Sequence, residues 1–230
     1  MADSNGKEDL KAHYNELIDK GLDAKKVELV VTDMLPAYKE VITEMFPNAR
    51  HQYCIFHFIQ HINKLFKAAL KAHRYSTFKI GERRAAHQIS LLMLKGQEKL
   101  TEAERSTVFT FCETYPNMGS GYALKEDIRT LYANAECLEQ AYAYKDMIEA
   151  EYNYIVCNEM QKALVFVKNN FEPTVAYLHK GYFLDKTNND AERMMRAIKR
   201  TQQTHYFLRK EEYYIKKIKV VLGIQNPIAN

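Results

Sequence analysis

Residues 27–57 constrain the fold more than any other part of this 230-residue chain. An apolar, β-rich run over residues 27–32 stops at Asp33, and a short helical stretch follows until Pro47 ends it. A second strand is predicted over residues 50–54, and it leads into a long helix. Strands that alternate with helices are typical of α/β proteins, so we expect a sheet in this part of the chain.

Asp33 follows directly after the first predicted strand. An acidic side chain at the carboxyl end of a buried strand projects from the edge of an α/β sheet, where ligand sites tend to lie. The same residue is also placed to cap the next helix, because aspartate accepts hydrogen bonds from free amides at a helix start. The two roles are compatible, so Asp33 is a candidate site residue and a candidate cap.

A second informative stretch is residues 186–200, which read KTNNDAERMMRAIKR. Apolar residues recur there at i, i+3, i+4 and i+7 and predict one buried helix face; they are Ala191, Met194, Met195 and Ile198. Glu192 lies on the first turn, where the spacing from Asn189 suits a capping box. A carboxylate at this place could instead hold a metal ion. From this stretch alone, the capping role of Glu192 is favoured.

The same stretch carries the densest positive charge of the chain. Its basic residues are Lys186, Arg193, Arg196, Lys199 and Arg200. Clustered basic side chains bind a phosphate backbone. The formal net charge of the whole chain is only +4, so the composition permits a nucleic-acid partner without requiring one.

Cys54, His57 and His61 form a third candidate group. They recur at i, i+3 and i+7, which would place them on one side of a helix that began early enough, and such a group could bind zinc. No fourth ligand stands at motif spacing, and Cys54 is expected on the strand rather than on the helix. The alternative for His61 is an ordinary surface or core histidine.

Three motifs in this order resemble the catalytic core of ISL3-like DDE transposases (the IS204, IS1001, IS1096 and IS1165 type). They are Thr32-Asp33 followed by Tyr38, the Cys54-x-x-His57 pair after the next strand, and the Asn188-Asn189-x-x-Glu192-Arg193 helix. The resemblance covers most of the chain. It implies an α/β, mostly helical fold, in which a partial ribonuclease-H-like core is interrupted by an all-α insertion.

The resemblance also implies a function, namely DNA strand cleavage and transfer by two-metal-ion chemistry. Asp33 and Glu192 would bind Mg²⁺ or Mn²⁺, and His57 would lie near the same pocket. The basic residues of the Glu192 helix would bind double-stranded DNA, both transposon ends and target. We further expect a homo-oligomer.

One catalytic residue of that family has no counterpart here. A DDE core has a first Asp at the end of an earlier strand, and none of the candidates, Asp3, Asp9, Asp19 and Asp23, ends an apolar run. We therefore expect the chain to correspond to the C-terminal part of a transposase and to be inactive alone. Two other functions stay open: a non-catalytic nucleic-acid-binding remnant and a helical interaction module.

The domain organisation follows from a change of pattern. Residues 1–74 are assigned to the first part of the core, residues 75–170 to a helical insertion, and residues 171–230 to the return to the core with a basic C-terminal helix. Within the insertion, breaks are predicted at Gly96, at Pro116-Asn117 and at Gly119-Ser120-Gly121.

Cysteine usage and hydropathy indicate the compartment. The four cysteines form no CxxC pair, so reduced thiols are expected. No apolar run approaches the ~18 residues of a membrane span, and the N-terminal residues lack an apolar signal core. These features predict a cytoplasmic protein without a membrane partner.

Overall fold

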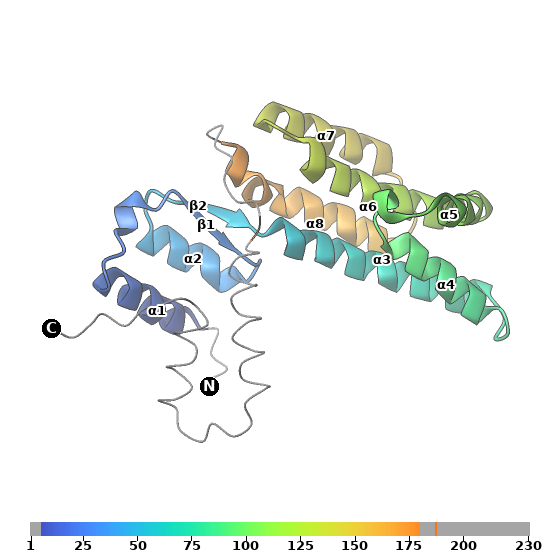
Figure 1. Cartoon of the computed structure of the whole chain (residues 1–230), viewed down its shortest axis with the longest axis horizontal. Helices are drawn as coiled ribbons and strands as arrows, with labels where there is room; N and C mark the ends of the chain where they lie inside the picture. The colour runs from blue at the N-terminus through green and yellow to red at the C-terminus, as the bar shows by residue number, and fades with distance from the viewer. Residues whose placement is uncertain (1–5, 180–186, 188–230) are drawn as a thin grey trace, which may run out of the picture. The chain divides into compact units, whose positions relative to one another are not determined.

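The computed structural model describes residues 6–179 and Thr187 (Figure 1). The chain divides into two compact units, residues 1–187 and 188–230, and the described residues all belong to the first unit. The described part contains eight α-helices, three short 3₁₀ helices and two strands. It is therefore mostly helical with a small α/β portion.

The two strands form a parallel pair. Strand β1 (Leu29–Thr32) is joined to β2 (Arg50–Tyr53) by helix α2 (Pro36–Met45), and Thr32 lies opposite Tyr53 in the register. Parallel strands require such a crossover, because the chain must return to the same end of the sheet before the second strand begins. The predicted strand–helix–strand order is thus confirmed.

Helix α1 (Lys7–Asp19) precedes the sheet and packs against α2. The ring of Tyr14 meets the ring of the buried Phe46 edge to face at 5.1 Å. The helix ends where Gly21 takes a φ of 103°, and the amides of Gly21 and Leu22 donate to the carbonyls of Ile18 and Leu17. This pair of bonds is a Schellman motif, which requires a left-handed residue that glycine adopts most easily. The 3₁₀ helix η1 (Ala24–Lys26) follows.

Long helices make up the rest of the described chain. Figure 1 shows α3 leaving the sheet and running beside α8, with α6 packed against α3. The helices are α3 (Ile55–Thr77), α4 (Arg83–Leu94), α5 (Glu102–Thr114), α6 (Pro116–Asn134), α7 (Leu138–Tyr152) and α8 (Asn158–Thr174), with η2 (Gln97–Lys99) between α4 and α5 and η3 (Ala176–Leu178) after α8. Among the described helices, none combines the length and apolar character needed to cross a bilayer.

The predicted break at Gly119-Ser120-Gly121 is wrong, because these residues lie inside α6. A Cβ atom at Gly119 would lie 3.0 Å from the carbonyl oxygen of Cys112 in α5, and one at Gly121 would lie 3.1 Å from Met160 of α8. Both glycines therefore allow α6 to approach its neighbours closely. Close helix packing, rather than a turn, explains their presence.

The main hydrophobic core belongs to the helices. It extends from Ile55 to Tyr177 and includes fully buried aromatic residues such as Phe58, Phe66 and Phe171. Val41 and Ile42 of α2 are equally buried but lie outside this cluster. The sheet portion and the helical portion thus have separate apolar centres.

A buried glutamine joins the two portions. Gln52 of β2 is fully buried; its side-chain nitrogen donates to the carbonyl of Thr174 at 2.9 Å, and its side-chain oxygen accepts from the amide of Tyr177 at 3.0 Å. These bonds attach the end of α8 and the start of η3 to the edge of β2. Buried polar groups are retained only when they are satisfied in this way.

Candidate functional site

Asp33 stands at the first position after β1 and is exposed. One of its carboxylate oxygens accepts a hydrogen bond from the amide of Leu35 at 3.1 Å, which shapes the turn that opens α2. Leu35 is the residue before the first turn of α2, and no side chain caps that helix, so the predicted capping role of Asp33 is wrong and its carboxylate supports the preceding turn instead. A carboxylate has about four lone-pair sites, so this bond leaves it able to bind a second partner.

Thr32 and His51 hold the strand end that carries Asp33. The hydroxyl of Thr32 donates to the carbonyl oxygen of Asp33 at 2.7 Å and lies 2.7 Å from Nε2 of His51 on β2. Burial, helped by the charge of Lys39, lowers the pKa of His51 to about 4. A neutral His51 that donates from Nε2 satisfies both bonds of the hydroxyl.

Tyr38, the last residue of the Thr-Asp motif, lies within electrostatic reach of Asp33. Burial raises the pKa of the Tyr38 phenol, and the negative charge of Asp33 raises it further. Tyr38 therefore stays a neutral donor beside the carboxylate. The motif residues are close to one another because the turn at Leu35 brings the start of α2 back towards the strand end.

His57 and Asp33 lie at the same pocket. His57 is on the first turn of α3, and the pocket of about 400 Å³ lies between that helix and the turn after β1. Its other lining residues are Met34, Leu35, Pro36, Gln60, His61, Lys64 and Phe166. The structure therefore brings together two predicted site residues that are separated in sequence by a helix and a strand.

The zinc group considered for Cys54, His57 and His61 does not form. Cys54 is fully buried just before α3, and its amide donates to the carbonyl of Thr32 at 2.7 Å. His61 stacks on Phe166 with ring centroids 4.2 Å apart. Within residues 6–179, no three His, Cys, Asp or Glu side chains are grouped so as to hold a metal ion.

The remaining predicted site residues lie outside the described part of the chain. They are Glu192 and the basic residues Lys186, Arg193, Arg196, Lys199 and Arg200. In the described part, Asp33 is the one carboxylate at the pocket that holds His57. The described residues therefore supply one metal-binding carboxylate and not a complete ligand set.

Several residues at this pocket were not among those predicted from the sequence. Gln60, Lys64 and Phe166 line it, and His51 supports the strand end. The spacing of Gln60 and Lys64 from His57 places them on one helix face, so helical periodicity carried a usable signal for both. Phe166, on α8, had no such signal, because only the packing of α8 against α3 brings it to the pocket.

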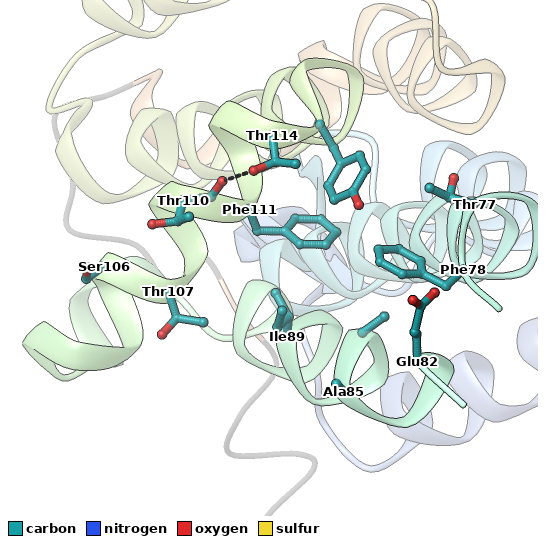
Figure 2. A pocket seen from close by; sticks show the side chains of 12 residues that line it. Thr77, Phe78, Glu82, Ala85, Ile89, Ser106, Thr107, Thr110, Phe111 and Thr114 are labelled. Atoms are coloured by element: carbon teal, nitrogen blue, oxygen red, sulfur yellow. Dashed lines mark hydrogen bonds between the residues drawn. The ribbon is translucent and has the colours of Figure 1, made fainter. Parts of the chain in front are cut away.

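A larger pocket, of about 670 Å³, lies between the end of α3, α4 and α5 (Figure 2). Phe78 and Phe111 stack there, and threonines of α5 line the opposite side. Its one acidic lining residue is Glu82, which accepts from the amide of Lys79 at 3.0 Å. None of the predicted site residues lines this pocket, so it is separate from the Asp33 pocket.

Comparison with known proteins gives one match. A family model for ISL3-type DDE transposases, described as Transposase, matches residues 1–218. No curated protein and no solved structure matches the chain. The matched region covers nearly the whole sequence, including both the Asp33 pocket and the stretch that carries Glu192.

Proposed function

The chain belongs to the ISL3-type transposase family, and from this premise we propose that Asp33 and Glu192 bind the metal ions of a DDE transposase that cuts and joins DNA strands. The observation that supports this most is the position of Asp33. It stands at the carboxyl end of a parallel strand, at a pocket that also holds His57. Ligands of α/β proteins bind at such strand ends.

The residues at the pocket suit Mg²⁺ or Mn²⁺ in part. Asp33 offers a hard oxygen ligand on a strand end that Thr32 and His51 hold in place. Glu192 is the second carboxylate in this proposal. When bound, a pair of divalent ions would activate the attacking oxygen of a phosphodiester reaction and stabilise the leaving oxygen.

His57 has a positioning role in this proposal. It lies on the first turn of α3 at the pocket that holds Asp33, where it would contact a DNA phosphate or orient a carboxylate. Lys186, Arg193, Arg196, Lys199 and Arg200 would bind the backbone of double-stranded transposon ends and target DNA. We further propose that the enzyme acts as a homo-oligomer.

In the same proposal, the two parallel strands are part of a ribonuclease-H-like core. Residues 1–74 and 171–230 belong to that core, and residues 75–170 form the helical insertion. Asp9 and Asp19 lie on α1 and Asp23 precedes η1, so among the described residues Asp33 is the one aspartate that directly follows a strand. Because the described residues offer no second aspartate at a strand end, we propose that this chain does not cleave DNA alone.

Metal binding tests the site without requiring cleavage. We expect the full chain to bind Mn²⁺ in an electron paramagnetic resonance titration, and Asp33→Asn or Glu192→Gln to weaken binding by at least about tenfold. Asp19→Asn removes an exposed carboxylate of α1 and should leave Mn²⁺ binding unchanged.

The outcomes separate the candidate functions. Equal Mn²⁺ binding by the parent, Asp33→Asn and Glu192→Gln would show that the proposed metal site is wrong. DNA binding without Mn²⁺ binding would favour a non-catalytic nucleic-acid-binding remnant. Metal-dependent nicking that Asp33→Asn abolishes would contradict the expected inactivity of this chain while supporting the site.

A further inference from the structure

A groove between α3 and α8 continues from the Asp33 pocket. The pocket at Asp33 and a neighbouring one of about 560 Å³ share two lining residues, His61 and Phe166. They therefore adjoin. The second pocket follows the two helices away from the strand end.

The α8 side of this groove is a regular stripe of uncharged or basic residues. Its members recur at helical spacing, so they share one face of the helix; they are Asn158, Gln161, Lys162, Val165, Phe166, Asn169 and Asn170. On the α3 side lie His57, Gln60, His61, Lys64 and Leu65. Two helices thus present amides and two lysines to the same groove, and two of these amides, Gln161 and Asn170, also donate to the carbonyls of Ile155 and Phe166 at 2.8 and 2.9 Å.

Charge and hydrogen-bonding capacity indicate what the groove binds. Among the described residues that line it, Asp33 at one end is the only acid, whereas Lys64 and Lys162 provide positive charge. Side-chain amides both donate and accept hydrogen bonds, and lysine binds phosphate as a point charge. This combination is complementary to a polyanion that also carries hydrogen-bonding groups.

The shared part of the groove is aromatic. Phe166 stacks on His61 with centroids 4.2 Å apart and on Phe58 at 5.0 Å. Burial, together with the charge of Lys64, lowers the pKa of His61, so its ring is uncharged near neutral pH. Aromatic rings that line a groove between cationic and amide side chains suit the bases of a single nucleic-acid strand.

We propose that this groove binds a single DNA strand that extends from the Asp33 pocket along α3 and α8. The inference rests on the proposed function, since it takes the Asp33 pocket as the place where the strand is cut or joined. It assigns to the helical residues a direct contact with the substrate. Lys64 and Lys162 hold the backbone, and the His61–Phe166 pair supports the bases.

The test is DNA binding by the full chain, measured by fluorescence anisotropy with a labelled single-stranded oligonucleotide over a salt series. The double variant Lys64→Ala/Lys162→Ala should bind about tenfold more weakly, and its slope of log K against log salt should fall by about 0.7 unit per lysine, as expected for a single strand. Both side chains are exposed, so circular dichroism should show an intact fold.

Matched variants serve as controls. Lys25→Ala/Lys99→Ala removes the same charge from exposed positions outside the groove and should bind as the parent does. Lys64→Arg/Lys162→Arg keeps the charge and should keep the parental salt slope. Phe166→Leu keeps an apolar side chain but removes the ring, and it should weaken binding with little change in slope.

The result that overturns the inference is a Lys64→Ala/Lys162→Ala variant with parental affinity and salt slope. Such a result would leave the metal site untouched, because Mn²⁺ binding by the parent and by Asp33→Asn is measured separately. Conversely, Asp33→Asn could bind Mn²⁺ as the parent does while Lys64→Ala/Lys162→Ala still binds DNA more weakly. That pair of results would show that the proposed metal site is wrong and would leave the groove assignment in place.

Discussion

His51 links the protonation of one side chain to the stability of the strand end beside Asp33. Its Nε2 atom lies 2.7 Å from the hydroxyl of Thr32, and that hydroxyl donates to the carbonyl of Asp33. Burial lowers the pKa of His51 to about 4 from the 6.5 of an exposed imidazole. The native state therefore favours the neutral ring, and the unfolded chain takes up a proton first as the pH falls.

This shift predicts a pH dependence of folding. Between about pH 7 and about pH 4, the unfolded state binds more protons than the native state, so the free energy of unfolding should fall as the pH is lowered. The decrease should begin near the ordinary histidine pKa and end near the native value of about 4. Urea denaturation across this range measures it.

His51→Gln should flatten that pH dependence, because glutamine has no proton to gain. His13→Gln, at an exposed position of α1, should leave the parental dependence unchanged. An unfolding free energy whose pH dependence is the same in His51→Gln and in the parent would contradict the assignment.

At the scale of elements, Gln52 decides how β2 meets the end of α8. Gln52→Leu keeps the size of the side chain but leaves the carbonyl of Thr174 and the amide of Tyr177 buried without this partner. Each buried group that loses its partner costs about 1–3 kcal/mol, so for these two groups we expect the free energy of unfolding to fall by about 2–6 kcal/mol. Urea denaturation at neutral pH measures the change.

Gln88→Leu is the matched control, because Gln88 is exposed on α4. That change should stay within about 0.5 kcal/mol of the parent. If both leucine variants had the stability of the parent, Gln52 would not be the link between the sheet and the helices.

At the scale of the whole molecule, burial is unevenly distributed. Helix α1 contains no buried residue, whereas α3 buries Ile55, Phe58, Ile62, Phe66, Ala69 and Leu70. Helices with few buried apolar side chains open locally at low free-energy cost. We therefore expect amide hydrogens of α1 to exchange much faster than those of the middle of α3 and α8.

Hydrogen exchange followed by mass spectrometry tests this order. Peptides from α1 should exchange by local opening, and peptides from α3 should exchange only at rates close to those of global unfolding. Equal protection of α1 and α3 would contradict the separation of the sheet portion from the main core.

Much of the secondary structure could be predicted because its causes are local. Helical periodicity predicted the long helix after the second strand, where α3 lies, and Pro47 predicted the end of α2 near Met45. The glycines of α6 misled the prediction, because their local preference for turns is overridden by the close approach of Phe66 and Met160. In the sequence, this close contact is visible only as a glycine, which has no side chain.

The sequence by itself determined that Asp33 follows one strand and that His57 follows the next strand. It also determined the family to which these motifs belong. These features depend on neighbouring residues and on spacing along the chain. Only the tertiary structure decided that Asp33 and His57 share a pocket with Phe166, and that a stripe of amides on α8 continues from it. The reason is that these contacts join residues more than a hundred positions apart, and packing of α8 on α3, rather than any local preference, brings them together.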